Sequence, residues 1–187
     1  ALPRELVENE PSGLTLLRSA QRAFLSLGSG ITAMRDMGAP SGIIPALKDA
    51  VSLGVIKGPA IVTCDTQLTI TGGYGRRANV LGREVDGPDG MRKAVREIFK
   101  GGADFVKIMA SGKVSVAGPG LDVPQFTQEE MTSAVDEAHR LGRKVRDPAI
   151  GLKAIESSVS AGVDCIEHGN FLTQELAEEM AELAIYL

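Results

Sequence analysis

The feature that most constrains the fold is a unit that recurs along the sequence. In each copy an amphipathic segment ends in glycine, two or three residues follow, and a short apolar, β-branched run begins. The copies are "FLSLGSGITAMRDMG", "IFKGGADFVKIMASG", "AHRLGRKVRDPAIG" and "SVSAGVDCIEHGN". Glycine just past a helix allows the left-handed turn that closes the helix. The runs that follow are too short and too apolar for half-exposed strands, which indicates a parallel sheet buried on both faces.

This alternation predicts helices and strands in strict succession. We expect helices over 14–27, 43–53, 89–100, 128–141, 151–161 and 173–184, and strands over 31–37, 60–67, 104–109, 144–149 and 164–168. Such alternation is typical of α/β proteins with right-handed crossovers. No linker or low-complexity segment divides residues 1–187, so we expect one domain. Five strands are too few for an eight-stranded barrel, and the terminal segments suggest the middle of a larger domain.

Bulk composition excludes several classes of function. The net charge is -4, and the longest basic cluster is the pair Arg76 and Arg77, so a nucleic-acid surface is not expected. No apolar run reaches the roughly 20 residues that cross a bilayer, and the first residues do not resemble a signal peptide. Two cysteines, Cys64 and Cys165, do not make a disulfide framework, so a cytoplasmic location is expected.

A lysine interrupts one of the buried runs. Lys107 lies in "DFVKIMASG" between apolar neighbours, where an unpaired ammonium group is costly. Three interpretations remain open from the residues alone. The side chain could reach the rim of the sheet, act as an amine that forms a Schiff base, or be neutralised chemically and become an oxygen ligand for a metal.

Other polar residues also stand at the ends of predicted strands, where α/β proteins place their sites. Arg35 and Asp36 are interpreted as a strand-end ion pair, and Asp65 as a residue that turns the chain after its strand. Glu167 is expected to point outward toward a helix, and His168 alone would be read as a structural histidine. The remaining members of this set are Ser111 and Asp147, whereas His139 is expected on the surface of a helix.

Six blocks in register resemble the amidohydrolase superfamily, in particular its imidazolonepropionase-like and Xaa-Pro dipeptidase-like branch. The blocks are "GITAMRDMG", "TITGGYG", "GGADFVKIMASG", "PQFTQEEM", "AHRLGRKV" and "AGVDCIEHG". The resemblance runs from about residue 14 to the end of the chain. It implies a (β/α)8 TIM barrel, here a partial barrel that lacks the first and last strands, with one or two divalent metals, usually zinc.

The resemblance also implies roles for individual residues. Lys107 matches the family lysine that is carboxylated and shared between two metals, and His168 matches the sixth-strand histidine ligand. Tyr74 stands where the glycine-rich loop often has histidine, and would donate to the substrate carbonyl; packing over the barrel mouth is an equally weighted alternative. Pro148 replaces the fifth-strand histidine, and Asp147 faces the opposite side of a regular strand.

The function implied is metal-dependent hydrolysis of an amide or cyclic amide C–N bond in a small molecule or dipeptide, by a metal-activated water. The partners implied are that substrate and, in an oligomer, further copies of the chain, with no nucleic acid and no membrane. Two alternatives stay open. One is a degenerate or truncated member without catalysis, as Pro148 suggests, and the other is a Schiff-base lyase that uses unmodified Lys107.

Overall fold

The structure of the chain is a computed structural model that describes residues 10–73, 82–111 and 123–187. Tyr74, Arg76 and Arg77 lie outside these residues, so the expectations for them stay predictions. The helices are α2 (Ser12–Gly28), α3 (Ile43–Ser52), α4 (Pro88–Lys100), α5 (Gln128–Arg140), α6 (Leu152–Ala161) and α7 (Gln174–Glu182). The strands are β1 (Ala33–Asp36), β2 (Ala60–Thr63), β3 (Gln67–Thr69), β4 (Gly82–Glu84), β5 (Phe105–Lys107), β6 (Lys144–Ala149) and β7 (Cys165–His168).

All of the strand pairs in the described part are parallel, as the alternating pattern predicts. β1 pairs with β2, β3 with β4, and β6 lies between β5 and β7. Two backbone bonds join β5 to the segment before it: the Asp104 N–H donates to Thr63 O at 2.7 Å, and the Met109 N–H donates to Leu68 O at 2.9 Å. The predicted strands are therefore neighbours in chain order, with the segment that holds β2 and β3 between β1 and β5.

Two expectations about the strands need correction. The predicted strand 60–67 is divided into β2 and β3, because Asp65 between them has a φ of 58°, in the left-handed region that ends a regular strand. No strand is expected between 67 and 104 from the sequence, but this stretch contains β4, which pairs with β3 from Gln67↔Gly82 to Thr69↔Glu84. β4 consists of Gly82 and two charged residues, so it has no apolar pattern from which a strand could be predicted.

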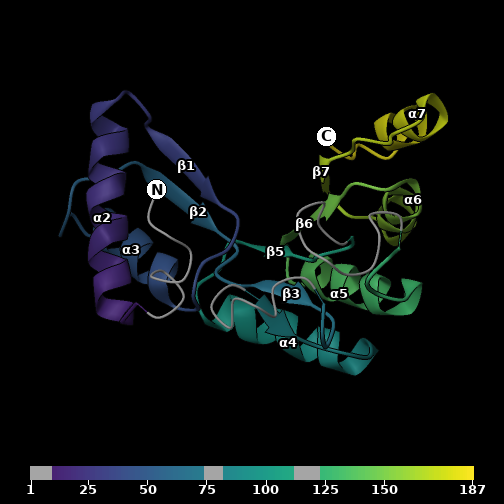
Figure 1. Cartoon of the computed structure of the whole chain (residues 1–187), viewed down its shortest axis with the longest axis horizontal. Coiled ribbons are helices and arrows are strands. Elements are labelled where there is room, and N and C mark those ends of the chain that lie inside the picture. The colour runs from purple at the N-terminus through teal and green to yellow at the C-terminus, as the bar shows by residue number, and fades with distance from the viewer. Residues whose placement is uncertain (1–9, 74–81, 112–122) are drawn as a thin grey trace.

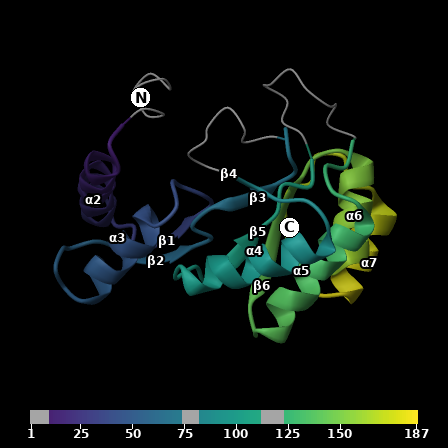
Figure 2. The same ribbon diagram turned by 90° about the horizontal axis from the view of Figure 1, so that it is seen from below.

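The helices lie on the outer side of a curved set of strands. Figure 1 shows α2 and α3 beyond β1 and β2, α4 and α5 below the middle strands, and α6 and α7 beyond β6 and β7. Figure 2 shows α4 and α5 from that lower side, lying across β5 and β6. The helices thus form an arc around the strands, and the opposite side of the strands carries no helix of the described residues. We call this side the inner face.

The hydrophobic core lies between the strands and α4, α5 and α6. Strand residues Leu68, Val106, Val145 and Ile166 are fully buried there. They pack with helix residues Met91, Val95, Met131 and Ile155, which follow the apolar spacing of their helices. Because strand side chains alternate, the next residues along the strands, Lys107, Arg146 and Glu167, face the inner side, as does Pro148 two positions after Arg146.

Capping explains where the central helices begin. Thr127 accepts from the Glu130 backbone N–H, and the Glu130 carboxylate accepts from the Thr127 N–H at 2.8 Å, which completes the predicted capping box of α5. The same carboxylate accepts from the Gly87 N–H at 2.6 Å, directly before α4. Glu130 therefore connects the starts of two neighbouring helices. No helix in the described ranges is long and apolar enough to span a membrane.

Candidate active site

Lys107, the last residue of β5, is half-buried on the inner face. Its Nζ donates to the backbone carbonyl of Met37 at 2.8 Å, just after β1. Burial lowers the pKa of the Lys107 amine, although Cys64, Asp36, Glu167 and Asp147 act in the opposite direction. Lys107, whose ammonium group would be costly among apolar neighbours, is therefore held near several acidic groups at the C-terminal end of its strand. Its lowered pKa shifts the amine toward the neutral form.

An ion-pair cluster lies on the same face. Arg35 of β1 pairs with Glu167 of β7 at 2.9 Å, and Arg146 of β6 approaches the same carboxylate at 3.7 Å. The Arg146 guanidinium also stacks over the Phe105 ring, 5.3 Å from its centre. Glu167 is thus an inner-face residue, and the expectation that it points outward to a helix is wrong. Because Glu167 directly follows the buried residue Ile166, the alternation of strand side chains could have predicted that Glu167 faces away from the core.

Arg35 and Asp36 do not form the expected strand-end ion pair, because each has another partner. Asp36 accepts from the Thr63 hydroxyl at 2.7 Å and from the Gly38 N–H at 3.3 Å, and burial raises the pKa of its carboxyl group. Burial also raises the pKa of the Cys64 thiol to about 12, so this cysteine beside Lys107 is not a thiolate at neutral pH.

His168 ends β7 and is exposed. In the strand register, Lys107 is level with Arg146 and Cys165, whereas His168 pairs with Ala149, three positions further along. Strict alternation would place Lys107 and His168 on opposite faces. However, the φ of His168 is 79°, so the regular strand ends at this residue and alternation no longer fixes its direction. The convergence of Lys107 and His168 on one centre stays a prediction.

Pro148 occupies the inner-face position of β6, and Asp147 before it points the other way. The Asp147 carboxyl group is fully buried, accepts from the Ala110 N–H at 2.9 Å and is hydrogen-bonded to the Ser158 hydroxyl of α6. Burial raises the pKa of Asp147 to about 7. Asp147 therefore does not reach the inner face, as expected for a regular strand, and β6 offers no carboxylate or imidazole there.

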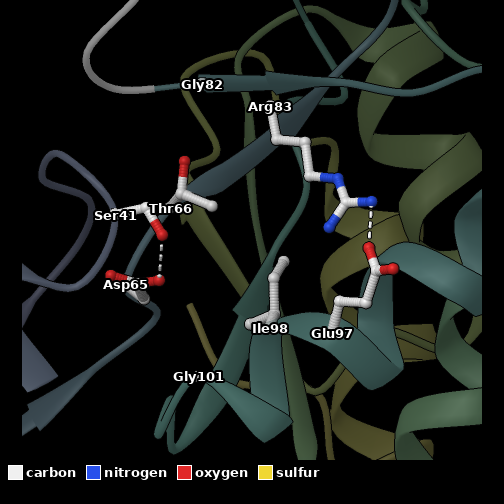
Figure 3. A pocket seen from close by; sticks show the side chains of 8 residues that line it. All are labelled: Ser41, Asp65, Thr66, Gly82, Arg83, Glu97, Ile98 and Gly101. Atoms are coloured by element: carbon white, nitrogen blue, oxygen red, sulfur yellow. Dashed lines mark hydrogen bonds and ion pairs between the residues drawn. The ribbon is translucent and has the colours of Figure 1, made fainter.

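A separate cavity of about 280 Å³ lies among the start of α3, the C-terminal end of α4 and β4 (Figure 3). Asp65 lies at its edge and accepts from the Ser41 hydroxyl at 2.9 Å and the Gly42 N–H at 2.7 Å, so it caps α3 from a distance. Asp65 thus turns the chain after β2, as expected, and in addition bonds the segment before α3. Arg83 and Glu97 form an ion pair on the other wall, and neither Lys107 nor His168 is among the described residues that line the cavity.

The sequence matches the model of the amidohydrolase family over residues 18–187, so the chain belongs to that family. Ochratoxinase from Aspergillus niger is 29% identical over 190 residues, which cover 90% of this chain and 39% of the enzyme. The chain therefore spans about two fifths of the length of this curated relative.

Solved structures agree with this family. A Xaa-Pro dipeptidase with methionine bound in its active site superposes with a TM-score of 0.84 at 30% identity, covering 100% of this chain and 47% of that one. A prolidase in complex with N-methylphosphonate-L-proline gives a TM-score of 0.86 at 33% identity, covering 95% of this chain and 47% of that one. The family expected from the six sequence blocks is confirmed.

Proposed function

We propose that this chain is part of an amidohydrolase that cleaves an amide or cyclic amide C–N bond of a small molecule or dipeptide. The observation that carries the proposal is Lys107, half-buried at the C-terminal end of β5 with a lowered pKa. The sequence resemblance matches this residue to the family lysine. The similarity to a Xaa-Pro dipeptidase and to ochratoxinase supports a carbonyl substrate with an amine leaving group. Water adds to the carbonyl carbon, the C–N bond breaks, and the leaving amine takes up a proton.

The fold of the complete protein belongs to the same proposal. The parallel strands in chain order, curved with helices on the outside, fit an arc of a (β/α)8 barrel over residues 1–187. Such a barrel places its site at the C-terminal ends of the strands, where Lys107, Pro148 and His168 lie. Tyr74, which follows β3 in the sequence and lies outside the described residues, is proposed as a donor to the substrate carbonyl.

The residues that the structure describes do not fit a complete metal centre. Zinc in catalytic sites takes three or more protein ligands, and this chain offers Lys107, once carboxylated, and His168. Pro148 has no donor atom, and the described residues contain no cluster of three or more histidine, cysteine or acidic side chains that could hold a metal. We therefore derive no catalytic step through a metal held by this chain alone.

The incomplete set of metal ligands favours a second candidate function, that of a family member without hydrolase activity. Both are tested by assaying a longer protein that contains this chain against Xaa-Pro dipeptides and N-acyl amino acids. Hydrolysis that is lost in Lys107→Ala and retained in the surface control Lys93→Ala would support the enzyme. Absence of hydrolysis in a folded, metal-supplemented protein would support the non-catalytic member.

A further inference from the structure

The parallel pairing of β5 with β6 stops beside Pro148. The two strands pair from Phe105↔Lys144 to Lys107↔Arg146, and the Ile108 N–H still donates to Arg146 O at 3.0 Å. In a continued parallel ladder, the next bond from β5 would run from the Ala110 N–H to Pro148 O, and residue 148 would donate its own N–H to β5. Proline has no N–H, and is therefore rare in a strand with neighbours on both sides.

Side chains bond the groups that the interrupted ladder would have joined. The Ala110 N–H donates to Asp147 Oδ1 at 2.9 Å, and the carbonyl of Pro148 accepts from the Ser111 hydroxyl at 3.2 Å. The Ser111 oxygen in turn accepts from the Ile150 N–H at 3.3 Å. Ala110, Ser111 and Asp147 are buried, so without these side chains the backbone groups would lose bonds that water could not replace.

We infer that Asp147 and Pro148 form a coupled pair: where the ladder stops at the proline, the Asp147 carboxyl group accepts from the Ala110 N–H in place of Pro148 O and positions the end of β5 just after Lys107. Pro148 and Asp147 then belong together in the structure of this strand end, and Pro148 is not merely the loss of one histidine ligand. The inference concerns the strand end itself and does not depend on the proposed hydrolase activity.

A double-mutant cycle on the 187-residue chain tests the coupling. Hydrogen exchange of the Ala110 amide is measured in the unmodified chain, Asp147→Ala, Pro148→Ala and the combined variant. We expect Asp147→Ala alone to lower the protection of Ala110 by about tenfold or more, because its buried N–H loses its acceptor. In the Pro148→Ala background the ladder can re-form, so the same change should lower protection by less than about threefold.

Two matched variants separate the bond from the rest of the site. Asp147→Asn keeps an acceptor for the Ala110 N–H and should retain its protection, whereas Ser158→Ala removes only the other partner of Asp147 and should leave Ala110 protected. If Asp147→Ala does not fold, a folded combined variant supports the pair, and an unfolded one overturns it. Equal losses of protection in both backgrounds, or no loss in either, would also overturn it.

Discussion

At the scale of single residues, the buried carboxyl group of Asp147 shares the Ser158 hydroxyl with the backbone carbonyl of Ala154. The Ser158 hydroxyl has one hydrogen and lies 2.7 Å from the carbonyl of Ala154, which can only accept. The single hydroxyl hydrogen can therefore serve only one of these two acceptors at a time. Burial raises the pKa of Asp147 to about 7, so this carboxyl group keeps its proton to a higher pH than an ordinary aspartate.

This protonation predicts how stability depends on pH. Because the folded pKa of Asp147 is about 7, above the ordinary 3.8, the folded state binds the proton more tightly, and stability falls as the pH rises from about 4 to 7. The slope from this residue is at most about 1.4 kcal/mol per pH unit. Asp147→Asn should remove this slope in urea unfolding, whereas Asp136→Asn on the exposed face of α5 should preserve it. An unchanged slope in Asp147→Asn would contradict the assignment.

The prediction of weak zinc binding also depends on single residues. With Lys107 and His168 as its family ligands, and with carboxylation of Lys107 itself favoured by bound metal, the chain alone should bind zinc weakly or not at all. After dialysis against a mild chelator, elemental analysis should show much less than one zinc per chain. In a longer protein that supplies the other ligands, Pro148→His should raise zinc occupancy. Unchanged occupancy would mean that the fifth-strand ligand has been misplaced.

At the scale of elements, Glu130 links the starts of α4 and α5. Glu130→Ala removes the acceptor of the Thr127 N–H and of the Gly87 N–H, so we expect a loss of about 1–3 kcal/mol in the free energy of unfolding. Glu129→Ala, its exposed neighbour in the same helical turn, should change stability by less than about 0.5 kcal/mol. Chemical denaturation of both variants measures the difference, and equal effects would argue against the link.

Most elements were predictable because each carries a local signal. The apolar spacing of α4 and α5, the capping box at Thr127 and the glycines after helices all depend on neighbours in sequence. β4 and the break at Asp65 were missed because they depend on contacts with distant segments. The same reason applies to the site: Lys107 and Pro148 stood out locally, whereas the partners of Glu167 and Asp147 lie on other strands and helices.

At the scale of the whole molecule, the curvature of the sheet explains the ion pair between Arg35 and Glu167. In a flat sheet, β1 and β7 would be separated by four strand spacings, about 19 Å, which one arginine and one glutamate side chain do not span. Their 2.9 Å contact therefore requires the strands to bend toward each other across the inner face. This bend is what an arc of a barrel would show.

The ion pair should accordingly help to hold the two ends of the arc together. Spin labels at exposed Gln21 of α2 and Glu179 of α7 would report the separation of these ends, since Cys64 and Cys165 are buried. Glu167→Gln should broaden the measured distance distribution or move it to longer distances. The surface control Glu178→Gln should leave it unchanged, and an identical distribution in Glu167→Gln would show that the ion pair does not restrain the arc.

The order of the strands also bears on how the chain is made. Each strand pairs with a neighbour from the adjoining part of the sequence. During translation, each new strand can therefore pair with the strand made just before it, as soon as it leaves the ribosome. The ion pair between Arg35 and Glu167 is different, because 132 positions separate the two residues. During synthesis from the N-terminus, Arg35 has no such partner until β7 has emerged, which makes the contact a marker for the docking of β7 during co-translational folding.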